Sequence, residues 1–190
     1  MPRLFVSTVA AAALAVALGS TSPIAQTAER FTAAAINMNR GAASSIEIVI
    51  NRFSTKAEQE RLMSTMLERG PEKLLNTLQD LPRVGYFRTP DSLAWDVHYA
   101  TKVPGSDGGE RVTLITDRRI GFWEASRQPR SIDYPFTVIE LRLNRDGEGE
   151  GKMSVATKII ADKDSNTVVL ENYDLQPVLL TNVKRERASQ

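Results

Sequence analysis

Alternation of apolar and polar residues dominates the second half of the chain and predicts β-strands. In the stretch 134–184, Ile139, Leu141 and Leu143 alternate with polar residues, and Gly-, Asp- and Asn-rich breaks separate this run from later ones. Such breaks are typical of tight turns. We therefore expect an antiparallel meander, with strands at 136–144, 153–159, 168–173 and 178–183.

The first half of the chain contains the same pattern at lower density. Ile46, Ile48 and Ile50 alternate with Glu47 and Asn51, which predicts the first strand at 46–53. Further short strands are expected at 83–88, 93–99, 112–116 and 120–123.

Between 55 and 82 the apolar period changes from two to nearly four, which predicts a helical hairpin. The run Thr55-Lys-Ala-Glu58 has the spacing of a capping box. Leu62, Met63, Met66 and Leu67 follow at helical spacing, and Gly70-Pro71 ends the first helix. Apolar residues at 74–81 predict a second helix, which Pro82 ends.

These elements predict a mainly β (α+β) fold with an antiparallel meander of about seven or eight strands. A long meander leaves two open edges, and curling into a barrel or half-barrel removes them. The helical hairpin would lie between the first and second strands. This layout resembles the intracellular lipid-binding barrels and the helix-grip domains, although no helix follows the last strand.

The N-terminal residues 1–28 are predicted to be a signal peptide. Arg3 is followed by the apolar run Val9–Leu18 and then by small residues, a pattern typical of exported proteins. We expect a flexible lead-in at 29–45 with a helical turn around 31–36, one β-rich domain at 46–184 and a disordered tail at 185–190. The protein would be periplasmic or secreted, with no transmembrane segment in the mature chain.

Three runs resemble those of uncharacterised exported bacterial proteins. They are Arg83-Val-Gly-Tyr-Phe-Arg-Thr-Pro90, Ile120-Gly-Phe-Trp-Glu124 and Asp146-Gly-Glu-Gly-Glu-Gly-Lys152. The resemblance implies a shared fold and export, and it implies no reaction.

Composition narrows the possible functions. The 24 Lys and Arg residues nearly balance the 23 Asp and Glu residues, which argues against a nucleic-acid-binding protein. The chain has no cysteine and a single histidine, His98, so disulfides, thiol nucleophiles and multi-histidine metal sites are excluded.

Two carboxylate-rich segments could hold a cation but are more typical of turns. Asp162, Asp164 and Asn166 have the opening spacing of a calcium loop, yet Thr167 and Tyr173 stand where that loop needs Gly and Glu. In the second segment, Asp146, Glu148 and Glu150 alternate with glycines. Such alternation is expected of a solvated hairpin. We therefore predict no metal and no cofactor.

His98 could form a catalytic pair with Asp96. Two residues apart on a strand, both side chains would point to one face, and the carboxylate could orient the imidazole. A solvent-facing histidine explains the same pattern, and no Gly-x-Ser-x-Gly motif supplies a nucleophile.

The irregular stretch 118–134 is the candidate ligand site. Arginines bind carboxylates or phosphates, and aromatic faces stack on rings or acyl chains. The alternative is that Trp123 belongs to the core and the arginines pair with nearby carboxylates. The candidate residues are Arg118, Arg119, Trp123, Arg127, Arg130 and Tyr134.

Together these observations favour an exported, non-catalytic domain that binds a small apolar or anionic ligand inside a curled meander. A protein-interaction module of the envelope or extracellular space is one alternative, with an unknown partner. A hydrolase or isomerase that uses His98 is another.

Overall fold

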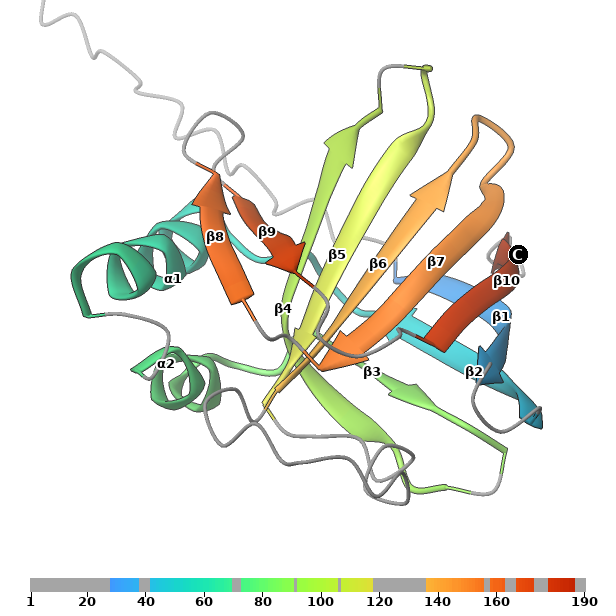
Figure 1. Cartoon of the computed structure of the whole chain (residues 1–190), viewed down its shortest axis with the longest axis horizontal. Coiled ribbons are helices and arrows are strands. Elements are labelled where there is room, and N and C mark those ends of the chain that lie inside the picture. The colour runs from blue at the N-terminus through green and yellow to red at the C-terminus, as the bar shows by residue number, and fades with distance from the viewer. Residues whose placement is uncertain are drawn as a thin grey trace, which may run out of the picture.

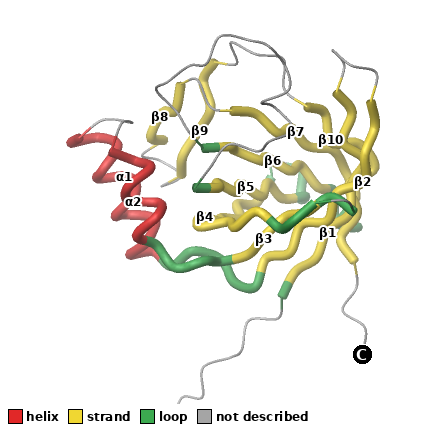
Figure 2. The backbone as a smooth tube through the Cα atoms, turned by 90° about the horizontal axis from the view of Figure 1, so that it is seen from below, coloured by secondary structure: helices red, strands yellow, loops and turns green. Residues whose placement is uncertain are grey.

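A closed β-barrel forms the body of the protein. The computed structural model describes residues 28–37, 42–69, 73–90, 92–105, 107–117, 136–155, 158–162, 167–172 and 178–186. In this part of the chain eight antiparallel strands close in the order β1, β10, β7, β6, β5, β4, β3, β2, and helices lie against one side (Figures 1 and 2). The barrel strands are β1 (Glu29–Asn37), β2 (Ala42–Ile50), β3 (Gly85–Arg88), β4 (Trp95–Pro104), β5 (Glu110–Thr116), β6 (Thr137–Leu143), β7 (Glu148–Val155) and β10 (Val178–Glu186).

Two further pairs of elements lie outside the barrel wall. Helices α1 (Lys56–Arg69) and α2 (Leu74–Asp80) connect β2 to β3, and strands β8 (Lys158–Asp162) and β9 (Thr167–Asn172) form a separate two-stranded sheet. The predicted fold class, a mainly β barrel with a helical hairpin, is confirmed. The hairpin follows the second strand rather than the first, because an unpredicted strand precedes it.

That unpredicted strand is β1, so the flexible lead-in predicted for 29–45 is wrong at 29–37 and 42–45. The expected helical turn around 31–36 is likewise replaced by extended chain. Phe31, Ala33 and Ala35 do alternate toward the interior, but alanine has little intrinsic preference for strands. Pairing with β2 on one side and β10 on the other supplies the stabilisation that local sequence lacks. The predicted tail at 185–190 is also too long, since β10 continues to Glu186.

The strands do not all pair in consecutive order, which corrects the predicted simple meander. Strand β10 pairs with β7, with Val178 opposite Met153, while β8 and β9 pair with each other. The strand predicted at 153–159 is divided between β7 and β8, and the one predicted at 120–123 lies outside the described residues. Alternation predicts most of the described strands, but it carries no information about which strand becomes the neighbour of another.

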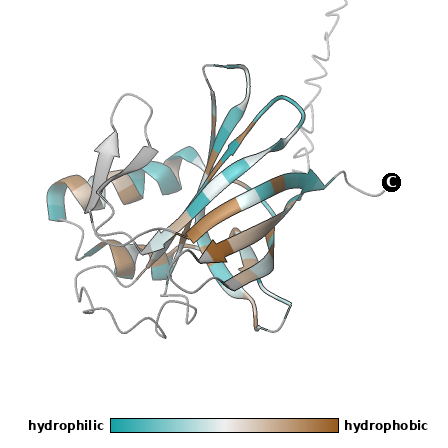
Figure 3. Ribbon diagram, turned by 45° about the vertical axis from the view of Figure 1, so that its right-hand side comes forward, coloured by the Kyte–Doolittle hydropathy of each residue, from teal (hydrophilic) through white to brown (hydrophobic). Residues whose placement is uncertain are grey.

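The barrel interior is filled by apolar side chains. Nineteen buried residues from the described strands and their connections form one cluster, each at most 6% exposed. Apolar and polar residues alternate along the wall, as Figure 3 shows in brown and teal. A ligand-sized cavity would expose the side chains around it, so the described interior is a packed core. At its edge, Phe87 and Trp95 stack with ring centroids 4.8 Å apart.

A second apolar cluster joins the helices to the outside of the barrel. Leu62 and Met66 of α1 and Leu78 of α2 pack with Tyr99 of β4 and Ile115 of β5. The predicted Leu and Met residues Leu62, Met63 and Met66 therefore face the sheet, whereas Leu67 is exposed. This packing fixes both helices on the outer surface of β4, β5 and β6.

A β-bulge at His98 allows β4 to serve both clusters. Val97 pairs with Thr116 and Tyr99 with Ile115, so His98 is the extra residue. Val97 and Ala100 consequently point into the barrel, whereas Tyr99 points out toward the helices. The apolar side chains of this strand therefore do not all share one face.

One end of the barrel interior is closed by four paired charges. Lys102 Nζ lies 2.6 Å from Glu29 Oε1 and 3.8 Å from Glu110 Oε2, and Arg185 Nε lies 3.2 Å from Glu29 Oε2. Arg185 also pairs with Glu110. These residues come from β1, β10, β4 and β5, so the pairs cross the barrel. We call Glu29, Lys102, Glu110 and Arg185 the barrel-end network.

We expect Arg185→Met to destabilise the fold by about 2 kcal/mol or more, because it leaves two partly buried carboxylates with one cation. Several atoms of the network, including Glu29 Oε2 and Glu110 Oε1, are shielded from solvent. Urea unfolding of the full chain measures the loss.

Lys184→Met is the matched control. Lys184 precedes Arg185 and pairs with Glu148 at 3.2 Å, but both side chains are more than half exposed. We expect a change within about 0.5 kcal/mol. Equal effects of the two substitutions would contradict a structural role for the network.

Candidate functional site

The six residues of the predicted ligand site lie outside the described residues. They are Arg118, Arg119, Trp123, Arg127, Arg130 and Tyr134. Their grouping stays a prediction. The described chain stops immediately before them at Asp117 and resumes at Phe136, which belongs to the cluster beneath the helices.

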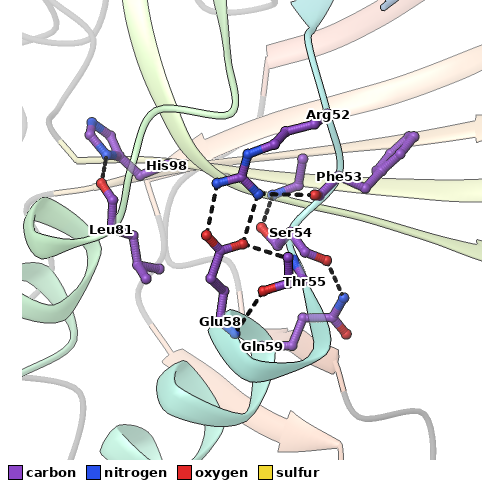
Figure 4. A network of polar contacts seen from close by, with 9 residues as sticks. Arg52, Phe53, Ser54, Thr55, Glu58, Gln59, Leu81 and His98 are labelled. Atoms are coloured by element: carbon purple, nitrogen blue, oxygen red, sulfur yellow. Dashed lines mark hydrogen bonds and ion pairs between the residues drawn. The ribbon is translucent and has the colours of Figure 1, made fainter. Parts of the chain in front are cut away.

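His98 contacts a different carboxylate from the one predicted. Its Nε2 lies 3.9 Å from Asp117 Oδ2, whereas Asp96 pairs with Arg83 at 3.0 Å. The bulge places His98 beside the end of α2, where Nδ1 is 2.8 Å from the Leu81 carbonyl oxygen (Figure 4). A carbonyl can only accept, so Nδ1 carries a proton and donates it.

This geometry gives His98 a structural task. Its side chain is 13% exposed, and one ring nitrogen faces a backbone carbonyl while the other faces a carboxylate. The hydrogen bond to Leu81 ties the chain after α2 to β4.

The predicted carboxylate segments differ from a metal site in the part of the chain described. Glu148 and Glu150 belong to strand β7, so the turn after β6 is shorter than the Gly-rich run suggested. Glu148 pairs with Lys184. Asp164 and Asn166 lie outside the described residues. Among those that are described, no group of three His, Cys, Asp or Glu side chains is arranged to hold a metal ion.

The start of α1 confirms the predicted capping box. The Glu58 amide donates to Thr55 Oγ1 at 3.3 Å, and the Thr55 amide donates to Glu58 Oε2 at 2.8 Å. Arg52 extends the box with two bonds to the Glu58 carboxylate, 2.7 and 2.8 Å long (Figure 4).

The same connection is bonded to the barrel wall through Ser54. The Ser54 amide donates to the Ala100 carbonyl at 2.8 Å, and the Ala100 amide donates to Ser54 Oγ at 3.0 Å. Gln59 of α1 donates to the Ser54 carbonyl. Helix α1 is therefore held at its N-terminus by β4 as well as by its apolar face.

We expect the contribution of Glu58 to stability to depend on pH. The hydrogen bonds from Arg52, with help from Thr55, hold the pKa of Glu58 below its ordinary value of 4.5. The pKa of such a carboxyl group is lower in the folded protein than in the unfolded chain. Its contribution to the free energy of unfolding is complete above the pKa of the unfolded chain, and it is lost as the pH falls through the pKa of the folded protein. Urea unfolding of Glu58→Gln should show a deficit at neutral pH that shrinks below about pH 4.5.

Glu60→Gln serves as the control on the same helix, because Glu60 is exposed and has no ion pair with any described residue. A deficit of Glu58→Gln that stays constant through the acid range would contradict the assignment.

The most distinctive hollow lined by described residues lies between the two helices. Its volume is about 290 Å³. The apolar sides of both helices face the barrel, so polar side chains line the space left between them. We call this the interhelical groove; its lining residues are Arg61, Ser64, Thr65, Glu68, Arg69, Lys73, Asn76, Thr77 and Asp80.

The three cations of the interhelical groove differ in their ion pairs. Arg61 pairs with Asp80 at 2.9 Å, but Arg69 and Lys73 make no ion pair with any residue that the structure describes. They stand on either side of the break between α1 and α2. With Glu68 and Asp80 counted, the described lining of the groove carries a net charge of one positive.

Other surface hollows differ in this respect. The hollow of about 480 Å³ beside the β4–β5 and β6–β7 hairpins contains Arg111 and Arg142, and both pair with Glu140. Cations of the β1–β2–β3 surface are also paired, since Arg30 and Arg88 share Glu47 and Arg30 also lies 3.5 Å from Glu186. Unpaired cations within a hollow thus distinguish the interhelical groove.

No protein-family model, curated protein or solved structure matches the chain. The resemblance to uncharacterised exported proteins stays a prediction. None of the described helices is long and apolar enough to cross a membrane.

Proposed function

We propose that this protein is a non-catalytic binding domain that takes a small anion into the interhelical groove. The supporting observation is the pair of cations, Arg69 and Lys73, that lie together in a hollow without acidic partners among the described residues. A guanidinium offers a planar fork to a carboxylate or phosphate, and an ammonium adds a point charge.

The packed barrel favours a ligand site outside the lumen. The interior side chains leave no room at the described positions, and the barrel-end network closes one end. An apolar ligand therefore has no described cavity to occupy, which directs the ligand hypothesis to a polar surface site.

The contacts of His98 favour binding over catalysis. Both ring nitrogens already face protein groups. A protein-interaction role has weaker support, because Leu67 and Leu93, the large apolar side chains exposed in the described chain, lie on α1 and on the loop before β4. Single exposed leucines are common on protein surfaces.

Export is part of the proposal and rests on the pattern of residues 1–28. A cleaved leader would leave a mature chain that begins near β1, with Glu29 free to join the barrel-end network. N-terminal sequencing of the protein from an expressing bacterium should find the new end near residue 28. A chain that retains residues 1–20 would contradict export by this route.

We expect inorganic phosphate and acetate to bind in the groove with dissociation constants on the order of 1 mM, since the site is polar and open. Nuclear magnetic resonance titration should shift the amides of α1 and α2. Arg69→Ala combined with Lys73→Ala should weaken both anions at least about fivefold, because the surface attraction of two cations is lost.

Lys56→Ala is the matched control, because Lys56 is an exposed cation of α1 that does not line the groove. The variant should bind phosphate and acetate with the same dissociation constants as the unmodified protein. Absence of saturable shifts with either anion, or an equal loss in Lys56→Ala, would contradict the proposed function.

A further inference from the structure

The floor of the interhelical groove carries three hydroxyl groups whose protons are already in use. Ser64 Oγ donates to the Arg61 carbonyl at 3.1 Å, and Thr65 Oγ1 donates to the same carbonyl at 2.8 Å. Thr77 Oγ1 donates to the Lys73 carbonyl at 3.3 Å. Hydroxyls that bond back to their own helix leave only lone pairs for other partners.

Thr65 and Thr77 also contact each other, which adds a contact without adding a proton. Their oxygens lie 3.2 Å apart across the two helices. The two threonine hydroxyls make three contacts: one with each other and one each with a backbone carbonyl. They have only two protons for these contacts, so at least one of the two hydroxyl oxygens accepts no hydrogen bond from the described chain. Both side chains are less than 10% exposed and line the groove, so an oxygen that does not accept from its neighbour has a lone pair left for a donor in the groove.

Glu68 adds a further acceptor to the groove, since it forms no ion pair with any described residue. The groove thus combines cationic donors at one end with acceptors along its floor and side. A simple anion satisfies the cations but brings no proton for the acceptors. A neutral polyol brings protons for the acceptors but no negative charge for the cations.

We propose that the ligand of the interhelical groove is a small anion bearing several hydroxyl groups, such as a sugar acid. This inference rests on the proposed function and refines it. The lining has three cations, Arg61, Arg69 and Lys73, and two anions, Glu68 and Asp80. That balance of one positive charge suits a hydroxylated monoanion better than a zwitterion, whose net charge is zero. The volume of about 290 Å³ can contain a ligand of this size.

The test compares gluconate, acetate and glucose on the full chain by magnetic resonance titration. Gluconate carries both the carboxylate and the hydroxyls, and the other two carry one each. We expect gluconate to bind at least about fivefold more tightly than acetate, because one or two additional hydrogen bonds form, and glucose to bind more weakly than either.

Two variants test which residues cause the preference for gluconate over acetate. Thr65→Val with Thr77→Val removes the acceptors without changing side-chain shape, and the ratio of gluconate to acetate affinity should fall toward one. Glu68→Ala should lower the same ratio, and its exposed position keeps it independent of folding. Thr32→Val on the outer side of β1 is the control and should leave the ratio unchanged.

The outcomes separate this inference from the proposed function. Equal binding of gluconate and acetate, lost together in the Arg69 and Lys73 double variant, would overturn the hydroxylated ligand and keep the anion site. A ratio that survives both the threonine and the Glu68 substitutions would place the hydroxyl recognition elsewhere and overturn the inference. Failure of every anion to bind would overturn both.

Discussion

Pairing of β1 with β10 is the constraint on which the remaining structure depends. It joins the first and last strands of the described chain, from Arg30 opposite Glu186 to Ile36 opposite Leu179, and so removes both edges of the sheet. Closure brings the inward residues of all eight strands together and forces them to fill one narrow interior. It also brings Glu29 and Arg185 opposite Lys102 and Glu110, where their charges compensate one another.

The proposed ligand site lies on the surface of a barrel whose described interior is packed. The two helices line the interhelical groove on that surface, and their position follows from the barrel. The bulge at His98 turns Tyr99 outward to make an apolar seat, while Ser54 and the Arg52–Glu58 pair fix the approach to α1. These contacts attach both helices to the barrel, and in the proposed function such attachment would preorganise the interhelical groove.

Alternation and helical period predicted the fold class, the helical hairpin and its capping box, because each depends on residues close in sequence. Three features escaped because they depend on distant partners. Strand β1 is stabilised by neighbours on both sides rather than by its alanines. The pairing of β10 with β7 excludes β8 and β9 without any local signal. The carboxylate beside His98 is Asp117 rather than Asp96, because one extra residue in β4 changes the direction of the side chains.

The candidate site illustrates the same limit. In sequence, Thr65 and Thr77 are ordinary helix residues, and a β-branched hydroxyl in a helix is expected to bond to the carbonyl four residues earlier. Each does so. Only the packing of α1 against α2 brings the two oxygens within 3.2 Å and creates a shortage of donors between them. Arg69 and Lys73, which form no ion pair with any described residue, line the same hollow. The proposed preference for anions that also donate hydrogen bonds therefore rests on the contact between the helices, and neither helix sequence carries it alone.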